Sequence, residues 1–280
     1  MRHFALAALL AVATVMPAAA QGTELEPERC PRLVAGLWPS PMLREDRATP
    51  AGLLVPAQAE AGLVDLTFIG HSTFLIESPA GVTIATDYNG VVKPGVIPRI
   101  VTMNRAHSTH YTYNPEPEIE YVFHGWGDDG EPARHELAIE DVWLRNVTTN
   151  IRGGFGMSGA IQRDMNSMFV FEVAELCIAH LGHLHHELTP EHLKALGRID
   201  VVLAPVGGSY TLDVEEMIDV LDKIRAPLVI PMHYFGQATL ARFLARLEEG
   251  YAIEYSDGPH VGLSRDTLPA MRTVLVLPGY

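Results

Sequence analysis

The hydrophobic and polar positions divide the chain into two parts with different periods. From about residue 63, short apolar segments alternate with turn-forming Gly, Ser and Pro, a pattern that predicts strands. These segments are VDLTFIG, TFLIES, VTIATD, IPRIVTM, EYVFHG, a hairpin over RHELAIEDVWLRNVTT, and the pair MFVFEV and LCIAHL. After the last of these segments, strands alternate with helices. The first part is therefore predicted to be mostly β, and the second part α/β.

The second part contains three predicted helices. TPEHLKAL has a helix-start signature, with Thr189 as N-cap and Pro190 in the first turn. DVEEMIDVLDKI and ATLARFLARLEE each carry one apolar stripe. VVLAPV and PLVIPMHY are strands between them, and YAIEYS and RTVLVLP close the chain. Two mixed sheets packed face to face, with helices outside, would bury both parts in one layered domain.

The N-terminal residues have the pattern of an export signal. Arg2 precedes the apolar run FALAALLAVATVM, and small residues end at Gln21, so we expect a cleavable signal peptide over 1–20. The run is too short for a stable membrane anchor. Residues 21–62 are rich in Pro, Ala and Glu and predict an irregular lead-in to one domain over 63–280. The mature protein is expected to be exported to a bacterial periplasm.

Composition narrows the class of partner. The chain has 280 residues, of which 48% are hydrophobic and 19% charged, as in an ordinary globular protein. Its net charge of -14 argues against a nucleic-acid partner, and a small-molecule substrate is expected instead. The oligomeric state stays open. An oxidising compartment would permit a disulfide between Cys30 and Cys177, but Cys177 also fits a small buried side chain.

Histidines follow three of the predicted strands. His107 and His110 follow the strand that ends at Met103, a cluster begins at His180, and His233 follows PLVIPM. Strand ends at one edge of a sheet are where ligands collect, and neutral imidazole is the commonest transition-metal ligand. We therefore expect a metal site at this edge.

Not every histidine is expected to bind the metal. The cluster comprises His180, His183, His185 and His186, and only part of it can face one ion. The rest are expected to be hydrogen-bonded or solvated. The same ordinary role is expected for His124, His135, His192 and His260.

Five segments follow one another in an order typical of a known family. They are LTFIGHSTFLIES, GVTIATD with Asp87 at its end, RAHSTH, HLGHLHHELT and VIPMHY. In this order they resemble the metallo-β-lactamase superfamily, and more narrowly the branch of ascorbate-6-phosphate lactonase-like proteins and N-acyl-phosphatidylethanolamine-hydrolysing phospholipases. The first two resemble the opening hairpin and the next strand, RAHSTH occupies the place of H-x-H-x-D-H, HLGHLHHELT that of H-L-G-D-L-G-H-x-L-T, and VIPMHY that of the strand with the last ligand. The likeness covers about residues 63 to 235.

The resemblance implies a four-layer αββα sandwich of two mixed sheets with a two-metal site, commonly zinc, in which a metal-activated water attacks a carbonyl or phosphoryl centre. This chain departs from the motif. Arg105 and Thr109 replace the first His and the Asp, and His183 replaces the bridging Asp. Without those carboxylates two adjacent dications are hard to hold, and a permanently cationic Arg105 repels a metal. One zinc ion is therefore expected rather than two.

The expected roles follow from this comparison. The predicted metal ligands are His107, His110, His183 and His233. Arg105 is expected to orient an anionic group or stabilise an oxyanion, and Asp87 to act as a base or as the partner of a ligand. The residues expected to lie behind the ligands are His71, His180 and Thr109. Four protein ligands would close the site, whereas three plus water would leave it open for catalysis.

Two functions remain open from the sequence. The first is an exported metal-dependent hydrolase that acts on a small ester, lactone or phosphodiester. The second is a non-catalytic periplasmic protein that binds a metal or a small molecule on the same scaffold. The loss of motif ligands favours the second, while the four retained imidazoles fit both. A true β-lactamase is not favoured, since none of these motifs reports on β-lactam recognition.

Overall fold

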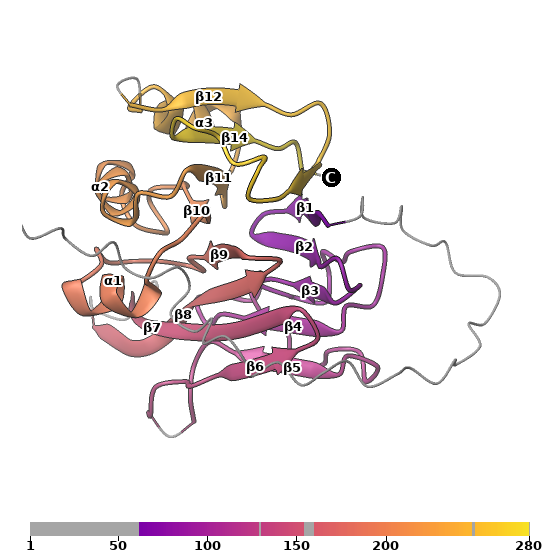
Figure 1. The fold of residues 1–280 in the computed structure, drawn as a ribbon. Helices are drawn as coiled ribbons and strands as arrows, with labels where there is room; N and C mark the ends of the chain where they lie inside the picture. Colours follow the sequence, from indigo (N-terminus) through magenta and orange to yellow (C-terminus); the bar gives the residue numbers. More distant parts are fainter. Residues whose placement is uncertain (1–61, 129, 154–159, 248–249, 280) are drawn as a thin grey trace, which may run out of the picture.

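A computed structural model describes residues 62–128, 130–153, 160–247 and 250–279 (Figure 1). Its strands form two sheets. The six-stranded sheet has the order β13-β1-β2-β3-β4-β5. Its members are β1 (Val64–Gly70), β2 (Thr73–Glu77), β3 (Thr83–Ala85), β4 (Ile100–Met103), β5 (Tyr121–His124) and β13 (His260–Leu263).

The eight-stranded sheet has the order β12-β14-β11-β10-β9-β8-β7-β6. Its members are β6 (Glu136–Ile139), β7 (Val142–Arg152), β8 (Ile161–Val173), β9 (Leu176–His180), β10 (Val201–Pro205), β11 (Leu228–Met232), β12 (Ala252–Tyr255) and β14 (Thr273–Val276). Strands β9, β10 and β11 are parallel, as are β3, β4 and β5 in the other sheet. The loops after each parallel set therefore leave from one edge of its sheet.

Alternation along the strands builds two cores on either side of the eight-stranded sheet. In β8, Phe169 and Phe171 face the other sheet, whereas Met168 and Val170 face the helices. Successive side chains of a strand point to opposite faces, so strands rich in apolar residues can serve both cores. The predicted sandwich of two mixed sheets is confirmed.

The helices are α1 (Pro190–Leu196), α2 (Val214–Ile224) and α3 (Gln237–Leu244), and their buried residues pack on the outer face of the eight-stranded sheet (Figure 1). Helix α1 starts as predicted, since Thr189 and His192 form a capping box. Helix α3 ends earlier than predicted, because the N–H groups of Arg246 and Leu247 bond to the third preceding carbonyl and tighten the chain into a turn.

Several predictions concern the chain outside the described residues. They are the signal peptide over 1–20, the lead-in up to residue 61, and the pairing of Cys30. Cys177 is fully buried in β9. Because Cys30 lies outside the described residues, the pairing of the two cysteines stays a prediction. Among the described helices, none has the length and apolarity that crossing a membrane requires.

Candidate metal centre

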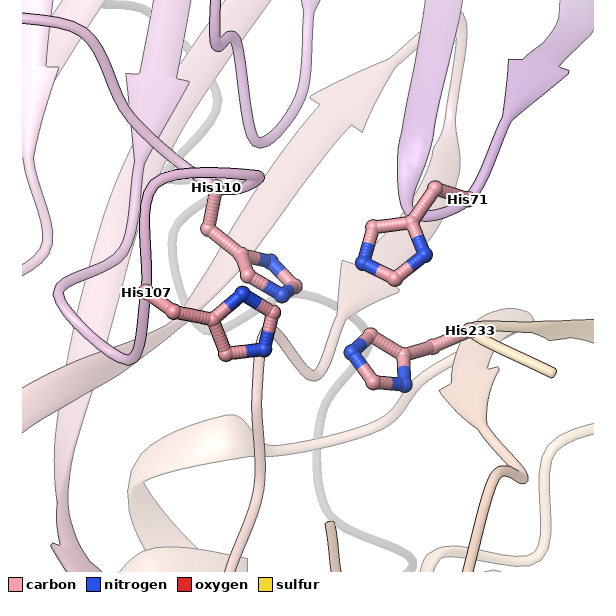
Figure 2. A group of neighbouring side chains, drawn as sticks. All are labelled: His71, His107, His110 and His233. Atoms are coloured by element: carbon pink, nitrogen blue, oxygen red, sulfur yellow. The ribbon is translucent and has the colours of Figure 1, made fainter. Parts of the chain in front are cut away.

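Four histidines from separate loops converge where the two sheets meet. His71 lies in the turn between β1 and β2, His107 and His110 follow β4, and His233 follows β11. Each ring offers one nitrogen, and the four nitrogens lie within 4.8 Å of one another. Figure 2 shows the four rings turned toward a common centre. Imidazole nitrogens in such a group are the ligands that zinc and related ions prefer.

Two of these residues hold an unusual backbone conformation. His71 and His233 both have a φ of 55°, in the left-handed region that costs a non-glycine residue of the order of 1 kcal/mol. The turn and the loop support each other, because the His233 N–H donates to the His71 carbonyl over 2.7 Å. Strained residues that neighbouring structure holds in place are characteristic of functional sites.

A buried carboxylate orients His110. Asp87 Oδ2 accepts a hydrogen bond from His110 Nδ1 over 2.6 Å, and Asn104 donates to Asp87 Oδ1 over 2.9 Å. Burial alone would raise the pKa of the Asp87 carboxyl, but the charge of His110 and these hydrogen bonds lower it to about 2. Asp87 thus stays ionised behind the ring, and Nε2 is the nitrogen of His110 that is left for a metal ion. These contacts fit the role of a ligand's partner, which is one of the two roles expected for Asp87.

Thr109 connects two rings of the group. Its hydroxyl lies 2.7 Å from His107 Nδ1 and 3.0 Å from His71 Nε2. The residue that replaces the motif aspartate therefore fixes ring orientation without bringing a charge. Burial lowers the pKa of both His71 and His107 to about 4. Both rings are thus neutral at physiological pH, as ligands must be.

The remaining ring shows that the site fits a metal ion. His233 is fully buried, and neither of its ring nitrogens has a hydrogen-bond partner among the described residues; the same is true of His110 Nε2. Burial, with the charge of His110 next, lowers the pKa of His233 to about 2. Buried polar atoms are normally satisfied, and a metal ion would supply the missing partner for His110 Nε2 and for one nitrogen of His233.

The cluster after β9 lies beside this group. His180 is fully buried, where its Nδ1 accepts from the Gly182 N–H and its Nε2 donates to the Ser72 carbonyl, the supporting position expected for it. His183 Nε2 lies 3.0 Å from His107 Nε2. The structure thus brings all four predicted ligands together, but the group within 4.8 Å contains His71 in place of His183.

Arg105 contacts an aromatic ring. Its guanidinium lies over the Trp126 ring, with 5.5 Å between the guanidinium carbon and the ring centroid. A different cation lies near the histidines: the charge of Arg152 lowers the pKa of His185 and His186 after the larger effect of burial.

An exposed aromatic pair borders the centre. Phe235 is 60% exposed, and its ring centroid lies 5.4 Å from that of His233 and 6.0 Å from that of His71. Tyr210, 50% exposed, contacts Phe235 with 5.4 Å between centroids. Large exposed aromatic rings next to a polar centre form a surface for the apolar part of a ligand.

Comparison with known proteins agrees with this geometry. A family model described as a beta-lactamase superfamily domain matches residues 65–233, which span β1 to the last histidine of the centre. The chain belongs to the metallo-β-lactamase superfamily. The match contains every strand end that supplies the four histidines.

Individual members of the superfamily resemble the chain over most of their own length. A UPF0173 metal-dependent hydrolase from Salinibacter ruber is 25% identical over 67% of this chain and 92% of that protein. A UPF0173 protein from Pyrococcus furiosus is 34% identical over 66% and 90%. A Thermotoga maritima structure, described as a candidate Zn-dependent hydrolase of the metallo-β-lactamase superfamily, has 28% identity, a TM-score of 0.57, and covers 78% of this chain and 100% of that chain.

Proposed function

We propose that this superfamily member is a metal-dependent hydrolase with one zinc ion in the group formed by His71, His107, His110 and His233. Three of these histidines bind the ion and leave its fourth position to a water molecule. The observation that carries the proposal is the convergence of four imidazoles, three of whose nitrogens are buried and without a partner among the described residues. Relatives named as metal-dependent hydrolases support the same activity. A bound zinc ion would acidify a water molecule and polarise the bond to be cleaved.

The chain's own residues prepare this chemistry. The Asp87 carboxylate holds the His110 ring by its Nδ1 proton, and Thr109 fixes the His107 ring in the same way. Ligands held by such partners need little reorganisation when they bind an ion. Because burial lowers the pKa of His71, His107 and His233, their neutral form is favoured up to the moment of binding.

The surroundings favour a substrate with an apolar part. We assign the Phe235–Tyr210 pair to the part of the substrate that does not react, and the ester, lactone or phosphodiester bond to the four-histidine centre. Arg152 is the cation best placed near His185 to attract a phosphodiester or a carboxylate. The predicted export of the chain would place this reaction in the periplasm.

Substrate panels before and after metal removal test the function. Purified protein should cleave at least one of a set of aryl esters, lactones and phosphodiesters, lose that activity with a chelator and regain it with zinc. The His233→Ala variant should lose both metal and turnover. If wild-type protein holds metal but cleaves none of the three classes, the chain is instead a metal-binding protein on the same scaffold.

A further inference from the structure

His183 and His185 form a hydrogen-bonded chain that ends on the backbone. The backbone N–H of Arg152 donates to His185 Nδ1 over 2.7 Å. His185 Nε2 lies 2.5 Å from His183 Nδ1, and His183 Nε2 lies 3.0 Å from His107 Nε2. His183 and His185 are 2% and 9% exposed, so both are held in a setting that favours neutral rings.

The backbone end of the chain fixes the position of every proton. A backbone N–H can only donate, so His185 Nδ1 is an acceptor. A neutral imidazole has one N–H, which in His185 must then be on Nε2, directed at His183 Nδ1. His183 Nδ1 accepts this hydrogen bond, so the single proton of a neutral His183 ring is on Nε2 and is directed at His107 Nε2.

We propose that His183 is a hydrogen-bond donor at this centre and not a metal ligand. A ring nitrogen that carries a proton has no lone pair for a metal ion. His107 receives the opposite role, because its Nε2 accepts from His183 and its own proton lies on Nδ1, toward Thr109. The inference rests on the proposed function in one respect only, namely that the centre binds a metal.

The donor has a use once His107 Nε2 coordinates an ion. The His183 N–H then loses its acceptor and becomes available to an oxygen of the substrate's carbonyl or phosphoryl group, where negative charge develops. The position of His183 is fixed, since its backbone N–H donates to Asn166 Oδ1 over 2.7 Å. Gly182, at a φ of 62°, lets the loop pass close to Asn166, because an added Cβ would lie 2.4 Å from that same oxygen.

Metal binding by matched variants tests the proposal without any substrate. The rings of His183 and His107 are adjacent, and the variants His183→Gln and His107→Gln each remove one of them. Circular dichroism checks that both variants fold. Zinc affinity is measured by competition with a chromophoric chelator. We expect His183→Gln to keep wild-type stoichiometry and to bind zinc within about 10-fold of wild type, the lower limit for a change at a ligand's partner. His107→Gln should lose the ion.

Proton positions are read directly by nitrogen-15 NMR of labelled histidines in metal-free protein. We expect the proton of His183 on Nε2. His185→Gln offers both an acceptor and a donor, so it should leave that proton in place, whereas His185→Glu offers only acceptors and should move it to Nδ1. A His183 proton on Nδ1 in the wild-type protein overturns the proposal.

The two experiments separate this inference from the proposed function. If wild-type protein binds zinc and both His183→Gln and His107→Gln lose it, His183 is a ligand, and only the inference fails. If wild-type protein binds no metal while His183 has its proton on Nε2, the proposed function fails and the proton assignment stands. In that case the donor role at a metal centre is overturned as well.

Discussion

The role of each histidine at this centre depends on the group that its ring contacts. His107, His110 and His233, three of the predicted ligands, do lie together in the structure, and each could be found because it follows a predicted strand. It placed His71 behind the ligands, since the Gly-His turn only meets β11 in the folded chain, through the His233 N–H. The proton on His183 was equally out of reach, because it depends on the backbone of Arg152.

The Asp87 carboxylate is expected to strengthen metal binding without touching the ion. Asp87→Asn keeps the shape of the side chain and removes the charge that the His110 N–H meets. We expect zinc affinity to fall by about 10- to 100-fold, since partners of metal-binding histidines have effects of this size. Chelator competition measures it, with the exposed Asp257→Asn as control. Unchanged affinity would mean that Asp87 only supports the fold.

Gly207 is expected to be essential for the position of His233. A Cβ at residue 207 would lie 2.4 Å from the His233 carbonyl oxygen and 3.2 Å from its Nδ1. Gly207→Ala should therefore displace the His233 ring and weaken zinc binding, whereas Gly95→Ala, with open space around it, should have no effect. Equal zinc affinity in the two variants would contradict this packing argument.

At the scale of elements, the sequence pattern predicted strands better than helix ends. The alternation in MFVFEV gives β8 its two apolar faces, and the Thr189 cap fixes where α1 begins. The end of α3 has no comparable signal, since ATLARFLARLEE stays amphipathic beyond Leu244. Long-range contacts decide such details: Arg145 of β7 donates to the carbonyls of Ala195 and Leu196 at the end of α1.

Glu172 of β8 should make stability fall as pH rises. Burial raises the pKa of this carboxyl from 4.5 to about 7, although the charge of Arg145 lowers it. The folded form therefore holds a proton that the unfolded form releases above pH 4.5, and stability is lost as pH rises toward 7 and through it. Glu172→Gln should gain stability relative to wild type between pH 5 and pH 8 in urea denaturation, and exposed Glu175→Gln should not. A parallel pH dependence in wild type and Glu172→Gln would exclude this assignment.

At the scale of the whole molecule, the two sheets bring together loops that are far apart in the chain. The parallel strands β3 to β5 and β9 to β11 direct their loops to the centre, and this arrangement follows from the sandwich that the motif order predicted. His71 and His107 follow strands of the six-stranded sheet, and His233 follows a strand of the eight-stranded sheet. A metal ion that binds all three therefore also links the two sheets. Metal binding should therefore stabilise the whole fold.

Chelation should lower the melting temperature of the protein. At a free zinc concentration about 100 times the Kd, binding adds about 2.7 kcal/mol to the free energy of unfolding. For a domain of this size that corresponds to about 5–10 °C. Thermal denaturation with and without chelator measures the shift, and His233→Ala should show none. A shift of the same size in His233→Ala would place the stabilising ion elsewhere.

The most direct test of the central claim is the metal content of tag-free wild-type protein, determined by elemental analysis after dialysis against zinc. The four-histidine centre predicts about one zinc ion per chain, lost in His233→Ala. Two ions per chain would contradict the single site, and none would contradict the metal centre itself.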